Sequence, residues 1–195
     1  MNTFASKFLP VAVGLLIGIP GAMSEDSAPA TNAKTIEPLH VGTKAPNFTR
    51  MTASGKKLSL KSFRGHLPVV LYFYPKDETP GCIKEACGFR DFENHMSGKA
   101  AAIIGVSGDS EEAHQYFMEH YTLPFDLIAD YDNSLLRMYH VPWYKGTLHK
   151  RVTFVIDKEG IIRNVIDDTN DGDEHVKRAT VALESLAKQQ AAISK

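Results

Sequence analysis

The sequence is poor in cysteine and carries almost no excess of charge. Two cysteines in 195 residues are too few for the multi-bridge scaffold of a small secreted domain. A formal net charge of −1 argues against the basic patch with which nucleic-acid-binding proteins usually contact phosphates. The mean hydropathy of −0.21 excludes a polytopic membrane protein, and the 14 glycines and 10 prolines are too few for a collagen-like or mucin-like stalk. What remains, with 43% hydrophobic and 23% charged residues, is the composition of one ordinary globular domain.

Charge is nearly absent from the N-terminus. Lys7 is the only charged residue between Met1 and Ser24, and an apolar stretch follows it. Small residues close that stretch, as at the cleavage site of a secretory signal, so we expect a signal peptide over 1–24 and export to a bacterial periplasm. The alternative is a retained anchor facing the periplasm, because the stretch is close to the shortest that spans a bilayer. Residues 25–38, rich in small and polar side chains, are predicted to be a flexible linker before a single folded domain over 39–195.

Strand and helix patterns alternate along that domain. The unbroken apolar run Val69–Tyr74 predicts a strand buried on both faces, and a helix is expected to begin near Cys82. Further elements are predicted at Ala101–Ser107 (strand), from Ser110 (helix, with serine as cap), Ser134–Tyr139 (short helix), Val152–Asp157 and Ile161–Ile166 (hairpin) and Asp173–Ile193 (amphipathic helix). A βαβ unit followed by a hairpin and a last helix predicts an α/β domain of thioredoxin-like type, with a central mixed sheet flanked by helices.

The two cysteines lie five residues apart, at the expected start of one helix. Their residue type alone allows a structural disulfide, half of a metal site or a redox pair. Positions five apart on a helix point about 140° away from each other, with Cα atoms roughly 8–9 Å apart. A disulfide needs less than about 7 Å, so Cys82 and Cys87 can bond only if the first turns of the helix unwind. This spacing favours a switch over a static bridge.

The residues around Cys82 favour the redox pair among the three uses of the cysteines. The chain reads Phe73-Tyr74-Pro75-Lys76-Asp77-Glu78-Thr79-Pro80-Gly81-Cys82-Ile83-Lys84-Glu85-Ala86-Cys87-Gly88-Phe89-Arg90-Asp91. This segment resembles the active-site signature of the peroxiredoxins, and most closely their bacterioferritin-comigratory-protein, or Q-type, branch. In that branch a second cysteine stands five residues after the first. The resemblance extends over about Val41 to Leu186.

The resemblance implies a role for each of five residues. Cys82 matches the peroxidatic cysteine, whose thiolate attacks a hydroperoxide and becomes a sulfenic acid, and Cys87 matches the partner that converts this acid into an intramolecular disulfide. Thr79 matches the threonine that donates a hydrogen bond to the sulfur, Arg151 the arginine that stabilises thiolate and peroxide, and Pro75 the proline that shields the nucleophile. A free thiol with a pKa of about 8.5 is only about 3% thiolate at pH 7, and a helix N-terminus alone contributes too little to change that. Charged hydrogen-bond donors are therefore needed.

The same resemblance implies the partners. Hydrogen peroxide or an organic hydroperoxide is the expected substrate, and a thioredoxin-like dithiol the expected reductant. No cofactor and no metal are expected, nucleic acid is not a partner, a monomer suffices because the disulfide is intramolecular, and a membrane is contacted only if the leader is retained.

Two other classes share the thioredoxin-like fold and stay open at this point. An exported copper-binding protein of the Sco type uses two cysteines and a histidine, but with three residues between the cysteines where this chain has four. A thiol-disulfide oxidoreductase requires Cys-x-x-Cys and a proline where this chain has Val152. The eight histidines lack metal-ligand spacing and are predicted to lie on the surface.

Several residues also have a simpler interpretation. Thr79 and Pro80 could form only a turn, and Arg151 could be a surface ion-pairing residue. Glu85 matches an acidic position common in the Q-type branch, but it could equally lie on a solvated helix face. Trp143 and Tyr144 could line the substrate entrance or merely cover the sheet.

Overall fold

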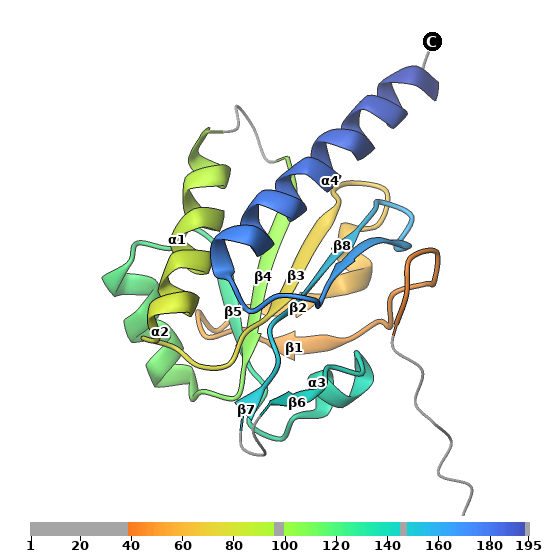
Figure 1. Cartoon of the computed structure of the whole chain (residues 1–195). Helices are drawn as coiled ribbons and strands as arrows, with labels where there is room; N and C mark the ends of the chain where they lie inside the picture. The colour runs from red at the N-terminus through yellow and green to blue at the C-terminus, as the bar shows by residue number, and fades with distance from the viewer. Residues whose placement is uncertain (1–38, 96–99, 145–147, 194–195) are drawn as a thin grey trace, which may run out of the picture. The chain divides into compact units, whose positions relative to one another are not determined.

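The computed structural model describes residues 39–95, 100–144 and 148–193 of the chain. Its centre is a five-stranded mixed sheet in the order β5-β4-β3-β8-β9 (Figure 1). The strands are β3 (Val69–Phe73), β4 (Ala102–Ser107), β5 (Asp126–Ala129), β8 (Val152–Ile156) and β9 (Ile162–Ile166). β3, β4 and β5 run parallel, whereas β8 is antiparallel to both β3 and β9. The thioredoxin-like α/β architecture predicted from the sequence is confirmed.

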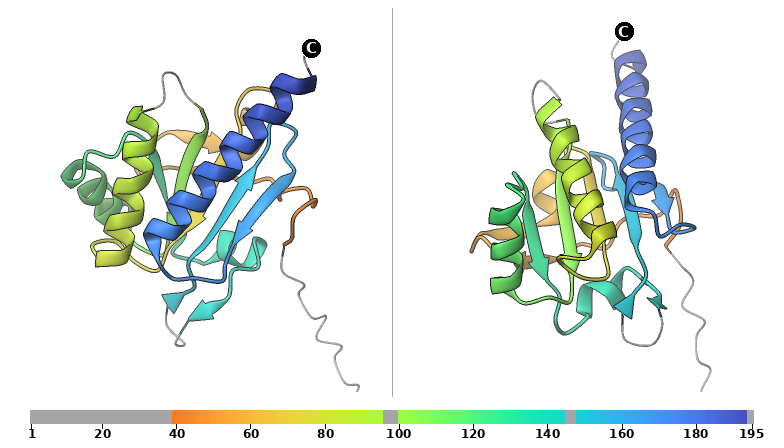
Figure 2. Two further views of the ribbon diagram at one scale, coloured as in Figure 1. Left: turned by 45° about the horizontal axis from the view of Figure 1, so that its top comes forward. Right: turned by 60° about the vertical axis from the view of Figure 1, so that its left-hand side comes forward.

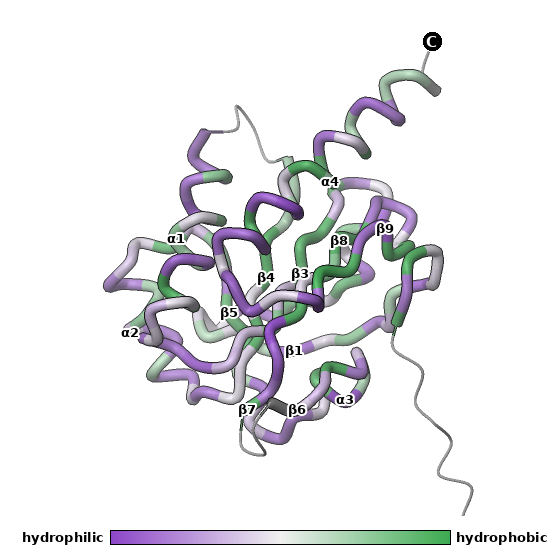
Figure 3. Tube along the Cα trace, viewed as in Figure 1, coloured by the Kyte–Doolittle hydropathy of each residue, from purple (hydrophilic) through white to green (hydrophobic). Residues whose placement is uncertain are grey.

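Strand β3 occupies the middle of the sheet because both of its faces are apolar. All five of its residues are buried, and alternate side chains enter different cores. Val70 and Tyr72 point toward the face covered by α1 (Pro80–His95), α2 (Glu111–His120) and α4 (Gly172–Ile193). Leu71 and Phe73 point toward the opposite face, covered by the 3-10 helix η1 (Leu60–Phe63) and by α3 (Ser134–Met138). In Figure 3 β3 and β4 are hydrophobic along most of their length, whereas α1 and α4 alternate, as helices with one buried face do.

The long predicted elements are confirmed, with small shifts at their ends. Helix α1 begins at Pro80, two residues before the expected start, because proline suits the first helical position and the Thr79 carbonyl accepts the first helical hydrogen bond, from the Ile83 N–H at 2.9 Å. Ser110 caps α2 as predicted, its hydroxyl accepting from the Ala113 N–H at 3.2 Å. The prediction missed the short strands β1 (Thr49–Met51), β2 (Lys57–Ser59), β5, β6 (Trp143–Tyr144) and β7 (Leu148–His149).

The beginnings of α1 and α4 pack against each other without room for a side chain. A Cβ atom at Gly172 would lie 2.4 Å from the Gly81 carbonyl oxygen and 2.9 Å from the Glu85 Cβ. The two helices lie together on one face of the sheet, and the C-terminal end of α4 extends beyond it (Figure 2). The first turn of α4 therefore rests directly on the first turn of α1.

The leader over 1–24 and the linker over 25–38 lie outside the described residues. Within the described ranges, none of the helices has both the length and the apolar character needed to cross a membrane.

Candidate active site

The candidate site lies where β3 ends and α1 begins. The loop between them is fixed by Asp77, a buried residue whose Oδ1 accepts from the Tyr74 hydroxyl at 2.7 Å and whose Oδ2 lies 2.7 Å from His114 Nδ1. The Asp77 backbone N–H also donates to Asp109 Oδ2 at 2.8 Å. Glu78, the next residue, has a φ of +58°, the left-handed region that non-glycine residues rarely adopt. The loop is thus anchored up to Asp77 and turns sharply before α1.

Cys82 stands in the first turn of α1 with its side chain turned toward the sheet. It is a free cysteine and only 1% of it is exposed. Because the first N–H groups of a helix have no helical partner, those at the start of α1 can bind an anion. The buried residues of α1 are Cys82, Glu85, Ala86 and Phe89, a stripe at the spacing of one helix face.

Arg151 reaches Cys82 because of the register between two strands. β3 and β8 are antiparallel with Phe73 opposite Val152, so the residue before β8 lies beside the loop that follows β3. Nη2 of Arg151 donates to Sγ of Cys82 at 3.2 Å, and Nε donates to the Asn170 carbonyl at 3.2 Å. The side chain of Arg151 is only 4% exposed, so its interpretation as a surface ion-pairing residue is wrong.

Arg151 also pairs with a buried acid. Its Nη1 donates to Oε2 of Glu85, whose side chain is 0% exposed. Burial disfavours the charge of Arg151, but the negative charges of Glu85 and Cys82 outweigh this and raise its pKa above the ordinary value. The guanidinium is therefore a permanent cation between two acidic groups.

Glu85 does not lie on a solvated helix face, contrary to that interpretation of the sequence. It stands three residues after Cys82 and therefore on the same, buried side of α1. Burial raises its pKa from 4.5 to about 7, against the opposing effects of Arg151 and of the nearby Thr153 hydroxyl. The i, i+3 spacing from Cys82 was the signal in the sequence that could have placed Glu85 in the site.

Thr79 and Pro75 flank the cysteine, but their predicted contacts differ. The Thr79 hydroxyl donates to the Lys76 carbonyl at 3.0 Å, so its single hydrogen is not directed to the Cys82 sulfur as the resemblance implied. The loop turns back on itself here, which brings that carbonyl within reach of the hydroxyl. Pro75 follows the end of β3 and is half-buried, and its shielding of the sulfur stays a prediction.

Cys87 lies on another side of α1, as the helical spacing predicts. It is also free, and it is half-buried near Arg90 and Tyr121 rather than facing the sheet. Burial raises the pKa of its thiol, against the effect of the Arg90 charge. Both cysteines belong to one continuous helix, so a bond between them requires α1 to unwind locally.

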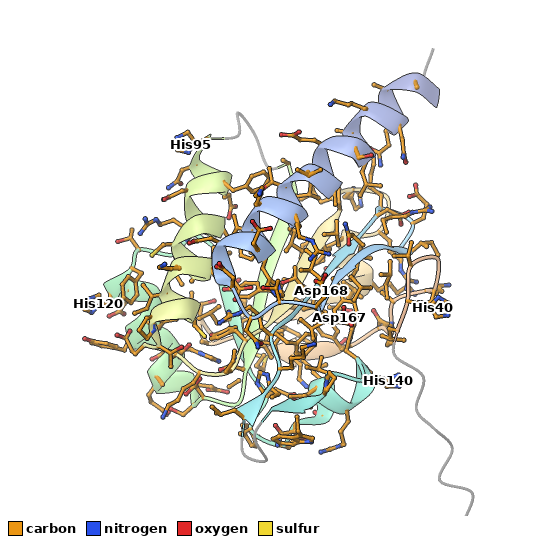
Figure 4. The ribbon with its side chains drawn as sticks, in the orientation of Figure 1. His40, His95, His120, His140, Asp167 and Asp168 are labelled. Carbon is orange, nitrogen blue, oxygen red and sulfur yellow. The ribbon has the colours of Figure 1, made fainter. Side chains whose placement is uncertain are left out.

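Three of the eight histidines are buried, contrary to the prediction that all lie on the surface. His114, His149 and His175 each have a polar partner in the interior, which is what makes their burial possible. Figure 4 shows His40, His95, His120 and His140 at separate places on the outside of the domain. Among the described residues no three histidine, cysteine or acidic side chains are grouped as metal ligands, so the two cysteines and a histidine of the copper alternative are not brought together there.

His175 is a component of the site that the sequence analysis missed. It lies in the first turns of α4 and is 0% exposed. Its Nδ1 is 2.7 Å from the Thr153 hydroxyl and 3.7 Å from Oε1 of Glu85, and its Nε2 is 3.2 Å from the Thr169 carbonyl. Burial lowers its pKa from 6.5 to about 4. Its position in a helix rich in charged residues gave no sign that it points inward.

Trp143 belongs to the short strand β6. It is 54% exposed and lines a hollow of about 310 Å³ with Pro75, Lys76 and Leu148. The entrance interpretation for Trp143 stays a prediction, because neither Cys82 nor Arg151 lines this hollow, and the side chain of Tyr144 lies outside the described atoms.

The chain is similar in sequence and in structure to known peroxiredoxins. The model of the AhpC/TSA family matches residues 41–165. The chain is 37% identical over 174 residues to a chloroplastic peroxiredoxin Q of Sedum lineare, covering 89% of this chain and 93% of that relative. It is 47% identical over 133 residues to a putative peroxiredoxin bcp of Coxiella burnetii, covering 65% and 87%. Among solved structures, the peroxidoxin BcpB of Mycobacterium tuberculosis matches with a TM-score of 0.67 and 31% identity, covering 74% of this chain and 96% of that one.

Proposed function

The chain belongs to the AhpC/TSA family and is a thiol-dependent peroxidase, and we propose that Cys82 is the thiol that reacts. The observation that carries this assignment is the hydrogen bond from Arg151 Nη2 to Cys82 Sγ, 3.2 Å long and buried at the start of a helix. A buried charged donor gives about 1.5–3 kcal/mol to a charged acceptor, and the helix N-terminus adds to this. Both favour the thiolate, which is the nucleophilic form.

The first step needs only Cys82 and a hydroperoxide. The thiolate attacks one peroxide oxygen, so that an S–O bond forms while the O–O bond breaks. Cys82 becomes a sulfenic acid, and the departing oxygen takes up a proton to leave as water or an alcohol. Arg151 donates toward the same place and stabilises the negative charge as it moves from sulfur to oxygen. Because Cys82 is 1% exposed, the peroxide reaches it only when the surrounding loop moves slightly.

Cys87 completes the cycle in this proposal. Its thiol displaces hydroxide from the sulfenic sulfur, which forms the Cys82–Cys87 disulfide and releases one water molecule. The helical geometry requires the first turns of α1 to unwind first. A thioredoxin-like dithiol then reduces the disulfide and is itself oxidised. Since both cysteines belong to one chain, no second subunit is needed.

We extend the proposal to organic hydroperoxides on the basis of the hollow beside Pro75. Trp143 and Leu148 give it an apolar part beside polar residues such as Asp109, and that part suits the organic portion of such a substrate. The bacterioferritin comigratory protein of Xanthomonas campestris, whose solved structure matches with 29% identity and a TM-score of 0.65, has alkyl peroxide reduction activity. Hydrogen peroxide, which has no organic part, does not use the hollow.

The decisive experiment compares two cysteine variants. The reduced protein is mixed with one equivalent of peroxide, and the product is identified by mass spectrometry. Cys82→Ser is expected to abolish the reaction, whereas Cys87→Ser is expected to react once and stop as the sulfenic acid. The wild type is expected to form the disulfide and to turn over repeatedly with thioredoxin. Equal loss of the single-turnover reaction in both variants would refute the assignment.

We also propose that the enzyme works outside the cytoplasm after removal of residues 1–24. The charge-poor N-terminus supports this, because a cationic start, an apolar stretch and small residues are typical of a secretory signal. Fusion of residues 1–38 to a reporter that is active only after export tests it. N-terminal sequencing of the mature protein distinguishes cleavage before Glu25 from a retained anchor.

A further inference from the structure

The two oxygens of the Glu85 carboxyl have unequal surroundings. Oε2 is bound by Arg151, but Oε1 is fully buried and has no hydrogen-bond partner among the described residues, although it lies 3.7 Å from His175 Nδ1. A buried carboxylate oxygen without a donor is costly, whereas the same oxygen in a protonated acid is much less so. The surroundings of Oε1 therefore favour the acid over the carboxylate.

The tautomer of His175 explains why no donor reaches Oε1. Nε2 is 3.2 Å from the Thr169 carbonyl, which can only accept, so the hydrogen of the neutral ring is on Nε2. Nδ1 then has a lone pair, and it accepts the single hydrogen of the Thr153 hydroxyl at 2.7 Å. The ring and the hydroxyl bond each other, which leaves Oε1 without a hydrogen bond, although the hydroxyl lies near enough to Glu85 to oppose the rise of its pKa. With its pKa lowered to about 4 by burial, His175 stays neutral at physiological pH.

The buried charges around Cys82 cannot all be ionised favourably. Within the described part of the chain, Arg151 is the cation that contacts both Cys82 and Glu85, and two anions beside one buried cation leave an uncompensated charge. From β3, Tyr72 faces the same acids, and burial followed by their negative charges raises its pKa well above 10, so it stays neutral. The remaining charges near His175 are Arg178 of α4 and Asp168 before it, which form an ion pair with each other.

We propose that Glu85 holds the proton that Cys82 gives up, and that Thr153 and His175 maintain this arrangement by keeping a hydrogen-bond donor away from Oε1. The proposal rests on Cys82 being the reactive thiol. The proton leaves the Cys82 sulfur and is bound by the Glu85 carboxylate, so the pair exchanges one proton and needs no other reactant. His175 and Thr153 act through Glu85 and are positioning residues.

Removal of the His175 ring gives the first test. In His175→Phe the Thr153 hydroxyl loses its acceptor and is free to donate to Oε1, which stabilises the carboxylate. Glu85 then holds the proton less well, and Cys82 retains it to higher pH. The readout is the rate of alkylation by iodoacetamide against pH, measured with Cys87→Ser so that Cys82 is the only thiol. We expect the midpoint of this profile to rise by roughly 0.5–1 pH unit, or about three- to tenfold slower alkylation below the midpoint.

Double variants separate this mechanism from a general disturbance of the fold. Glu85→Gln resembles the protonated acid and should lower the midpoint, and in that background His175→Phe should no longer move it. The effect of His175→Phe should also vanish with Thr153→Val, which has no hydroxyl, and persist with Thr153→Ser, which keeps one. A shift that is equal in the presence and absence of Glu85 would overturn the proposal. The matched control is His66→Phe, the same change at an exposed residue before β3, at the end of the strand opposite Cys82.

Infrared difference spectroscopy gives a direct readout even if a variant folds poorly. Alkylation turns the Cys82 thiolate into a neutral thioether. The positive charge of Arg151 then compensates only Glu85, so the Glu85 carboxyl should ionise. We expect the C=O band of a protonated carboxylic acid in the reduced Cys87→Ser protein at pH 7, lost on alkylation and absent from Glu85→Gln. An unchanged spectrum would overturn the proposal. Alkylation requires no peroxide, so this result is independent of whether Cys82 reduces peroxides.

Discussion

Replacing Glu85 with glutamine is expected to stabilise the folded protein at alkaline pH and to leave it nearly unchanged at acidic pH. The glutamine carbonyl can still accept from Arg151, as the protonated acid does. In the wild type the folded-state pKa is about 7, above the ordinary 4.5 of the unfolded chain, because the carboxyl is buried. Between these pH values the folded protein binds one more proton than the unfolded chain, so the free energy of unfolding falls as pH rises.

The size of this effect follows from the two pKa values. Their difference of about 2.5 corresponds to about 3 kcal/mol at 1.36 kcal/mol for each pKa unit. This stabilisation is fully present below pH 4.5 and is lost as pH rises through about 7. Urea unfolding of the reduced wild type and of Glu85→Gln, at intervals from pH 4 to pH 8.5, should show the variant gaining by about this amount. A difference between the two proteins that does not change with pH would contradict the argument.

His175 provides a control of opposite sign. Its pKa is lowered by burial from 6.5 to about 4, so the unfolded chain binds the additional proton. Its contribution is present above pH 6.5 and is lost as pH falls through about 4, by a similar magnitude. The stability of His175→Phe relative to the wild type should therefore fall with increasing pH, where that of Glu85→Gln rises.

Three further outcomes follow from the packing around the site. Gly172→Ala should lower the free energy of unfolding by about 1–3 kcal/mol and slow peroxide reduction, because the new Cβ would meet the Gly81 carbonyl at 2.4 Å; urea unfolding and a peroxidase assay measure both. Trp143→Ala should reduce kcat/KM for a bulky organic hydroperoxide about tenfold and leave that for hydrogen peroxide unchanged, and equal losses would exclude the hollow as a binding site. His114→Leu should destabilise the protein by about 1–3 kcal/mol, because Asp77 loses a buried partner; faster proteolysis within the loop before α1 would accompany it.

The sequence predicted the elements whose signals are long and local. β3 and β8 are unbroken apolar runs, and α4 repeats its apolar positions over many turns. The strands that escaped prediction have two to four residues, too few for a period to be seen. They exist because they pair with neighbours, as Thr49–Met51 does with Lys57–Ser59.

The site residues likewise differ in whether their signal in the sequence is local. Cys82 and the residues of its loop could be proposed as site residues because they form one continuous motif, and the helical spacing predicted that Cys87 lies on a different side of α1. His175 was wrongly predicted to lie on the surface and Glu85 was left undecided, because an acid and a histidine on helices usually face water. Only the contacts of α4 with α1 and with β8 show that they face inward, and the residues that Arg151 joins are 66 and 69 positions away in the chain.

The tight packing of Gly172 against Gly81 links the reduction potential of the proposed disulfide to the stability of the first turns of α1. In the proposed cycle, formation of a Cys82–Cys87 disulfide would separate the first turns of α1 from α4, so the free energy that holds these turns together would oppose oxidation. Each 1.4 kcal/mol of such packing raises the reduction potential of the disulfide by about 30 mV. In that cycle the helix contact would make the oxidised enzyme a better electron acceptor for a thioredoxin-like dithiol, and refolding of α1 would help to drive each return to the reduced state.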